Sequence, residues 1–219
     1  MKKLFVSLLI LTMFCGCSTS SDTDVTEQTT ENLISNTQTT EFVTSEIQET
    51  VDAAAPETIE ENIIIAYFSQ TGNTERLAED IHNTVGGDMF EITTVTPYPD
   101  DYNTLVDQAR QEQDEDFRPE LATHIDNIEQ YDIIFLGYPN WWSDLPMPVF
   151  SFLDEYDLSE KTIIPFCTSG GGGFGNGVES MQSAEPDAIF KEGFEVDGSS
   201  VDGAETNVNE WLDGLGLEE

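Results

Sequence analysis

Basic side chains are scarce in this sequence. Its 219 residues include 7 Lys and Arg against 44 Asp and Glu, which gives a formal net charge of −37. A protein that binds nucleic acid or an anionic membrane through its surface needs a basic face, so the composition argues against both. The excess of carboxylates instead favours a partner whose contact face is basic or neutral.

Cysteine and histidine are rare as well. Two of the three cysteines lie within the first 17 residues, and only Cys167 remains for the body of the chain. An internal disulfide framework is therefore excluded there, and a lone cysteine at a strand end is expected to pack rather than react. His82 and His124 have no second ligand at metal-binding spacing, so we expect solvated helix residues and no metal site. The sequence shows no Ser-His-Asp constellation, so it suggests no catalytic residue of that kind.

The amino terminus has the layout of a secretory signal. Two lysines precede an apolar stretch at residues 4–14, which is too short to span a bilayer. Gly16-Cys17 then resembles the cleavage site of a bacterial lipoprotein signal. The resemblance implies that residues 1–16 are a signal peptide, that Cys17 carries lipid, and that the protein is anchored outside the cytoplasm to the bacterial cell membrane. Simple secretion with cleavage nearby is the alternative.

The next segment has a different composition. Residues 18–60 are rich in Ser, Thr, Gln and Glu and contain no Lys or Arg. Such a segment cannot bury enough apolar surface to offset its ordering entropy. We therefore predict that residues 17–61 are the lipidated cysteine and a disordered acidic tether, and that residues 62–219 form the folded domain.

The folded region opens with a strand, a polar loop and a helix. Residues 62–68 form an apolar run rich in β-branched side chains, and helical spacing of apolar residues follows up to Val85. The first loop, residues 69–74, supplies hydroxyls, side-chain amides and one glycine but no lysine or arginine. A helix N-terminus offers free N–H groups and a favourable dipole to an anion. The loop suits a phosphate monoester held by neutral donors, or it is simply an ordinary helix cap.

The rest of the chain alternates between strands and helices. We predict strands at residues 88–92, 133–136, 162–167 and 188–196, and helices at 102–114, 123–130, 146–156, 178–183 and 204–215. This alternation predicts a parallel sheet covered on both faces. Ligands of such sheets bind beyond the carboxyl ends of the strands, which directs attention to the loops after the first, third and fourth strands.

The second loop, residues 138–144, contains Pro139, Asn140, Trp141 and Trp142. Neighbouring side chains diverge, so at least one tryptophan is expected over the ligand crevice, where its flat face can stack. The alternative is that both cover the edge of the core.

The third loop, residues 168–177, is rich in glycine. Six of the 16 glycines fall between residues 170 and 177. Glycine clusters where the backbone takes unusual angles or approaches a ligand closely, although a flexible surface turn would have the same composition.

The sequence resembles the flavodoxin-like superfamily over about residues 62–217. The resemblance lies in three motifs and their order along the chain: Ser-Gln-Thr-Gly-Asn-Thr, Tyr-Pro-Asn-Trp-Trp and Cys-Thr-Ser-Gly-Gly. The resemblance implies an α/β fold with a doubly wound, five-stranded parallel sheet in order 2-1-3-4-5 and three α/β/α layers. It also implies FMN, with its phosphate at the first loop and its ring between residues 140–142 and 168–171. The implied cofactor-binding residues are Ser69, Gln70, Thr71, Gly72, Asn73, Thr74, Pro139, Asn140, Trp141, Trp142, Thr168, Ser169, Gly170 and Gly171.

The function implied by the resemblance is electron transfer outside the cytoplasmic membrane, with a redox partner protein. An FMN-dependent NAD(P)H oxidoreductase acting on quinones or similar acceptors is one alternative, and a flavin-free binding module is another. The three loops have no Lys or Arg to grip a dinucleotide, which favours the carrier. Many flavodoxins have a glycine in the second loop that bonds the half-reduced flavin. Residues 139–146 lack one, and this departure favours two-electron chemistry.

Overall fold

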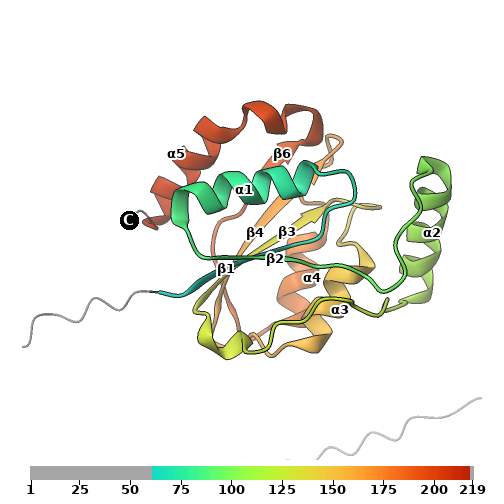
Figure 1. Cartoon of the computed structure of the whole chain (residues 1–219), viewed down its shortest axis with the longest axis horizontal. Helices are drawn as coiled ribbons and strands as arrows, with labels where there is room; N and C mark the ends of the chain where they lie inside the picture. Colours follow the sequence, from blue (N-terminus) through green and yellow to red (C-terminus); the bar gives the residue numbers. More distant parts are fainter. Residues whose placement is uncertain (1–60, 218–219) are drawn as a thin grey trace, which may run out of the picture. The chain divides into compact units, whose positions relative to one another are not determined.

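The computed structural model describes residues 61–217. The signal peptide, Cys17 and the tether up to residue 60 lie outside the described residues, so their assignments stay predictions. Within the described part, no helix is long and apolar enough to cross a membrane. The described chain forms a central sheet with helices on both faces (Figure 1).

All strands of the sheet are parallel, and β3 lies at its centre. The order is β2-β1-β3-β4-β5, with β6 also paired to β4. This confirms the predicted fold and strand order. Nearly every residue of the inner strands is buried, as expected when helices cover both faces of a parallel sheet. The strands are β1 (Ile63–Tyr67), β2 (Asp88–Glu91), β3 (Ile133–Pro139), β4 (Thr162–Ser169), β5 (Ile189–Phe190) and β6 (Phe194–Asp197).

The helices form the two outer layers. The core cluster on one face joins the sheet to α1 and α5 through residues such as Leu77 and Val208. The cluster on the other face joins it to α3 and α4 through Phe152 and Met181, and Figure 1 shows the two pairs on opposite sides. The helices are α1 (Asn73–Val85), α2 (Tyr102–Glu115), α3 (Met147–Glu155), α4 (Gly177–Ala184) and α5 (Glu205–Leu215), with short 3-10 helices η1 (Ile128–Gln130) and η2 (Gly198–Gly203).

The predicted fifth strand is divided into β5 and β6, which both pair with β4. The carbonyl of Ile163 in β4 accepts from Lys191 N, just after β5. Alternate residues of a strand turn their backbone groups to the same neighbour, so Pro165 faces this side as well and has no N–H to donate. The ladder is therefore interrupted beside Pro165, and Gly193 lies so close that an added Cβ would be 2.5 Å from the Pro165 carbonyl oxygen.

The predicted helix at residues 123–130 is wrong except for η1. The chain there instead covers the open edge of β2. Ala122 N donates to the Thr93 carbonyl over 2.8 Å, and the Thr123 hydroxyl donates to the Glu91 carbonyl over 2.8 Å. These bonds satisfy backbone groups that an edge strand leaves unpaired. His124 is accordingly not helical, and its Nδ1 lies 2.7 Å from the Glu155 carboxylate.

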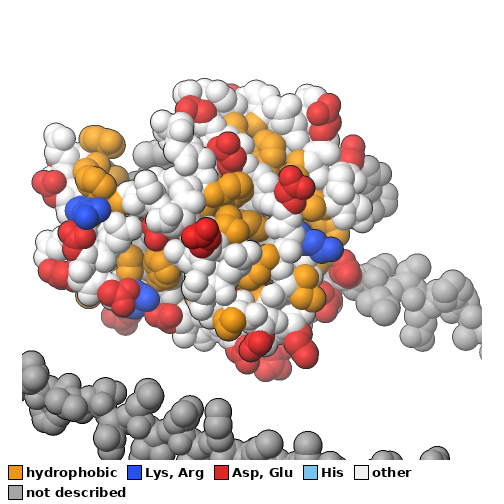
Figure 2. Space-filling view, turned by 180° about the vertical axis from the view of Figure 1, so that it is seen from behind, with side chains coloured by type: hydrophobic (Ala, Val, Ile, Leu, Met, Phe, Trp, Pro, Cys, Tyr) orange, Lys and Arg blue, Asp and Glu red, His pale blue; other side chains and the backbone are white. Residues whose placement is uncertain are grey.

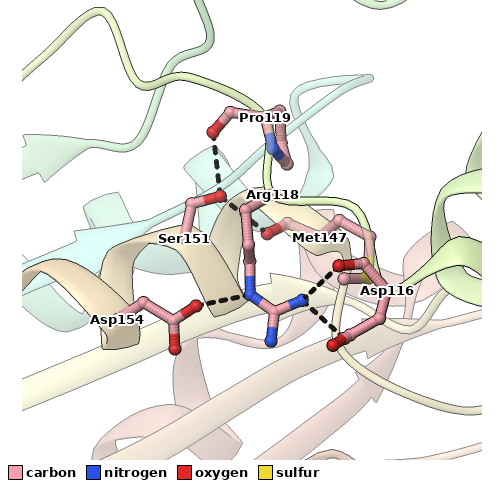
Figure 3. Close-up of polar contacts among 6 residues, drawn as sticks. All are labelled: Asp116, Arg118, Pro119, Met147, Ser151 and Asp154. Atoms are coloured by element: carbon pink, nitrogen blue, oxygen red, sulfur yellow. Dashed lines mark hydrogen bonds and ion pairs between the residues drawn. The ribbon is translucent and has the colours of Figure 1, made fainter.

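The segment after α2 is fastened to α3 (Figure 3). Arg118 Nη1 donates to the Asp116 carboxylate, and Arg118 Nε donates to the Asp154 carboxylate, both over 2.6 Å. The Ser151 hydroxyl in α3 donates to the Pro119 carbonyl over 2.8 Å. These bonds fix the path by which the chain returns from α2 to the sheet.

Candidate functional site

The first loop presents a row of backbone donors at the start of α1. Gly72 adopts the left-handed conformation (φ 85°), and α1 begins at the next residue. The Ser69 hydroxyl oxygen accepts from Glu75 N over 3.2 Å, which ties the start of the loop to the helix. The N–H groups of residues 69–74 find no protein acceptor within residues 61–217. Six successive free donors at a helix N-terminus are the geometry of an anion site.

The first and third loops are joined by their side chains. Thr74 is 1% exposed, and its hydroxyl oxygen lies 2.9 Å from that of Thr168 at the end of β4. One hydroxyl of the pair donates to the other, so the accepting one keeps a proton for a ligand. Both residues were predicted site residues, but nothing in the sequence indicates that their side chains are in contact.

The second and third loops are also bonded directly to each other. Asn140 N donates to the Thr168 carbonyl over 2.8 Å, and Asn140 Nδ2 donates to the Gly173 carbonyl over 2.6 Å. The Ser169 hydroxyl oxygen accepts from the N–H groups of Gly171 and Gly173, which shapes the third loop. Pro139, the last residue of β3, pairs with Thr168. These bonds join the second and third loops into one unit.

Gly170 and Gly171 lie on the open side of this unit. A Cβ added to either glycine would have no protein atom within 4 Å. The backbone φ of 100° at Gly171 favours glycine at that position, whereas Gly170 has no positive φ. Protein packing thus gives no reason for glycine at Gly170, whereas a ligand lying against the backbone would.

The two tryptophans diverge as predicted. Trp141 packs edge-on against Phe68 and Tyr98, with ring centroids 5.3 and 5.2 Å away. Trp142 is 47% exposed, and its backbone is left-handed (φ 52°). Its indole N–H donates to the Val106 carbonyl of α2 over 3.1 Å. One tryptophan therefore covers the end of β1, and the other reaches to α2.

A cavity of about 370 Å³ opens between the second loop and α2. The spacing of Leu105, Val106 and Ala109 predicts a packed face of this helix, but nothing in the sequence indicates that the face borders a cavity. That face covers the cavity instead of filling the core completely. The cavity is lined by Tyr102, Leu105, Val106, Ala109, Asn140, Trp141 and Trp142.

The surroundings of the first loop are acidic. The Glu75 carboxylate lies 3.9 Å from the Cβ position of Gly72. Burial and then Glu75 raise the pKa of Glu91, and burial followed by Glu91 raises the pKa of Tyr67 to about 12. Arg76 at the start of α1 is half exposed and pairs with Asp202 over 3.1 Å. An anion at this loop would therefore rely on neutral N–H donors in acidic surroundings. Figure 2 shows how Asp and Glu side chains are scattered over one face of the molecule, with few Lys or Arg side chains among them.

Cys167 packs in the core, as predicted. It is fully buried, and its thiol lies 3.4 Å from the Thr168 carbonyl oxygen. Burial raises the pKa of Cys167 to about 12, against a smaller lowering by Tyr138. A thiol that stays protonated is a poor nucleophile. Among residues 61–217 there is also no cluster of His, Cys, Asp and Glu that could hold a metal ion.

The sheet order defines a doubly wound α/β protein, and the donor row after β1 lies at the edge of the sheet where such proteins bind their ligands. A family model described as flavodoxin matches residues 62–215, and the chain belongs to the flavodoxin family. A search of curated proteins gives no match.

Solved structures agree with this assignment. A candidate flavoprotein from Bacteroides eggerthii is 34% identical with a TM-score of 0.62, and the match covers 71% of this chain and 98% of that one. A candidate flavoprotein from Bacteroides uniformis is 28% identical with a TM-score of 0.63, covering 70% and 98%. A Lactobacillus acidophilus flavoprotein, solved in complex with FMN, shares the fold at 23% identity and a TM-score of 0.54, covering 65% and 97%.

Proposed function

We propose that this protein binds FMN and transfers electrons outside the cytoplasmic membrane. The observation that carries the proposal is the row of free N–H groups at residues 69–74. Hydrogen bonds to a charged group contribute roughly 1.5–3 kcal/mol each, so a few of them can hold a phosphate without a basic side chain. Family membership and the FMN complex of the Lactobacillus relative support the same ligand.

The residues of the three loops fit this cofactor. The phosphate would be held by the N–H groups of residues 69–74, helped by the hydroxyls of Ser69 and Thr71. The ring would lie against the unit formed by Asn140–Trp142 and Thr168–Gly171, where the backbone at Gly170 is open. Bound FMN would supply the redox chemistry, while the chain supplies binding, orientation and an acidic field.

The acidic surface bears on the choice of partner. With 44 Asp and Glu against 7 Lys and Arg, the protein would attract a redox protein with a basic contact face and speed the encounter at low salt. We place the protein outside the cytoplasm, on a lipid anchor at Cys17 that makes its only membrane contact. Mass spectrometry of the mature N-terminus tests the anchor, because an unmodified Cys17 would contradict it.

The phosphate assignment can be tested with an isosteric change of charge. Gln70→Glu adds a carboxylate to the first loop without changing its volume. FMN should then bind about tenfold more weakly or worse, while riboflavin, which has no phosphate, should be almost unaffected. Gln111→Glu, on the exposed face of α2, is the matched control and should leave both ligands unchanged.

The outcomes of these titrations test the phosphate assignment and distinguish between the candidate functions. If Gln70→Glu lost equal affinity for FMN and riboflavin, the result would contradict phosphate binding at the first loop. A purified wild-type chain that binds neither flavin would favour the flavin-free binding module. An FMN-dependent oxidoreductase remains the second candidate because of the cavity beside α2, and rapid flavin reduction by NADH or NADPH alone would favour it over the carrier.

A further inference from the structure

The outer edge of β2, the first strand in the sheet order, is only partly covered. Ile92 N donates to the Tyr67 carbonyl of β1, so the even-numbered residues of this segment turn their backbone groups inward. The odd-numbered residues face outward, where the Glu91 carbonyl accepts from the Thr123 hydroxyl. Residues 122–123 therefore cover the carboxyl end of this edge and leave its beginning open.

Three backbone groups are free on the open part of the edge. They are the N–H and the carbonyl of Met89 and the N–H of Glu91, which find no hydrogen-bond partner within residues 61–217. The chain itself shows that this side accepts an antiparallel segment, because Leu121 bridges Thr94 in that direction. An edge with free main-chain groups is a template for a further extended segment.

A hollow of about 480 Å³ lies beside the open edge. Its apolar lining includes Phe90 and Ile125, and its carboxylates are Asp88 and Asp126. Phe90 packs with the core cluster on the α3 and α4 face, whereas Met89 packs with the cluster on the α1 face. Side chains directly opposite each other on neighbouring strands lie on the same face. In an added strand, the residue opposite Phe90 would therefore turn its side chain toward the hollow.

Charge decides which segment can occupy this edge. Asp88, Glu91 and Asp126 place three carboxylates around it, and no Lys or Arg lines the hollow among the described residues. A second copy of this chain would bring the same carboxylates against its own. Residues 18–60 are rich in Glu and contain no Lys or Arg, so they would be repelled as well. A basic segment of another protein balances the charge.

We propose that the open edge of β2 binds an extended segment of a partner protein in which basic and apolar residues alternate. The basic residues would bond through their main chain to Met89 and Glu91, with their side chains on the face of the Glu91 carboxylate. The apolar residues would enter the hollow beside Phe90. This edge lies beside the start of β2, whereas the candidate flavin loops follow β1, β3 and β4, so the inference does not depend on flavin binding.

The test is calorimetric titration of the full chain with the peptide Lys-Val-Lys-Ile-Lys-Val-Lys, blocked at both ends. N-methylation of every lysine residue removes the N–H groups that would face β2 and should weaken binding about tenfold or more. N-methylation of the valine and isoleucine residues, whose N–H groups would face solvent, is the matched control and should change affinity less than about threefold. Hydrogen exchange should show that the unmodified peptide protects the N–H groups of Met89 and Glu91.

A pair of protein variants separates local recognition from net charge. Asp126→Asn removes one carboxylate of the hollow and should weaken the unmodified peptide about two- to fivefold. Asp213→Asn, on the exposed surface of α5, makes the same change of charge elsewhere and should leave the affinity unchanged. Equal losses in the two variants would show that only net charge attracts the peptide and would overturn the proposal. Equal binding of the two N-methylated peptides, protection confined to other N–H groups, or no binding of the unmodified peptide would also overturn it.

Discussion

The hydroxyl oxygens of Thr74, in the first turn of α1, and Thr168, near the carboxyl end of β4, lie 2.9 Å apart, although the residues are 94 positions apart in the chain. Through this bond the loop that carries the candidate phosphate donors is tied to the loop that carries the open glycines. The candidate site is thus organised by a contact between two small polar side chains and not by any charged group.

Removing one member of this pair should destabilise the fold. In Thr74→Val the Thr168 hydroxyl stays buried without its partner, which should cost about 1–3 kcal/mol in urea unfolding. The double variant Thr74→Val/Thr168→Val should lose less than the sum of the single losses. Thr71→Val, at an exposed position of the same loop, should change stability by less than about 0.5 kcal/mol. Strictly additive losses would show that the two hydroxyls do not interact.

Gly170→Ala should separate ligand binding from folding. An added Cβ meets no protein atom within 4 Å, so we expect a change in unfolding free energy below about 0.5 kcal/mol. If the flavin lies against this backbone, FMN should bind about tenfold more weakly. Unchanged FMN affinity, measured by flavin fluorescence, would place the ring elsewhere.

Substitution by alanine should change the stability of the fold in opposite directions at two other glycines. An added Cβ at Gly137 in β3 would overlap the ring of the fully buried Phe166, so Gly137→Ala should cost about 1–3 kcal/mol. Gly214 lies within α5, where a Cβ has no neighbour within 4 Å. Gly214→Ala should therefore stabilise the protein by about 0.5–1 kcal/mol. Thermal unfolding of both variants checks the contrast, and a stable Gly137→Ala protein would contradict the packing of β3.

Arg118 should contribute more to stability than an unpaired surface cation. It joins two carboxylates on different elements and lies over the ring of Phe150, but it is partly exposed, so solvent screening limits the effect. Arg118→Ala should cost about 1 kcal/mol in urea unfolding. Lys191→Ala removes the same charge from an exposed position and should change stability by less than about 0.5 kcal/mol. If both variants changed the unfolding free energy equally, the change in net charge would explain the loss, and the contacts of Arg118 would not.

Glu185 should make stability depend on pH in the acidic range. Burial raises the pKa of Glu185, opposed by a hydrogen bond from Leu158 and assisted by Asp157 and Asp154. A carboxyl with a raised folded-state pKa stabilises the fold below its ordinary pKa of 4.5, and this contribution is lost as pH rises through the folded-state value. Glu185→Gln should therefore gain stability relative to wild type at pH 7 but not at pH 4.

Asp101 provides a control of opposite sign for the same measurement. The hydroxyl and N–H of Thr104 lower the pKa of Asp101, which caps α2. Its contribution is present above the ordinary pKa of 3.8 and is lost as pH falls through the folded-state value. Asp101→Asn should lose stability relative to wild type at pH 7 and lose less at pH 3. Parallel pH profiles for the two variants would contradict both assignments.

The sequence by itself determined the sheet and identified the loops of the candidate site. The apolar runs at residues 62–68 and 133–136 are typical of strands buried on both faces of a parallel sheet, and the alternation with amphipathic helices then leaves few arrangements. The donors of the first loop and the glycines of the third were visible because local spacing and backbone freedom are encoded residue by residue. The segment at 188–196 predicted a single strand, but local pattern could not show that Pro165, on a neighbouring strand, would divide it.

Only the tertiary structure decided how the loops meet. The bonds of Thr74 to Thr168 and of Asn140 to Gly173 join residues whose chemistry is unremarkable in sequence, because a hydroxyl or an amide bonds equally well to water. The same holds for α2, where the spacing of Tyr102, Leu105, Val106 and Ala109 marks an apolar face but does not say what lies opposite. Whether such a face fills a core or lines a cavity depends on the distance to its neighbour, which the fold as a whole sets.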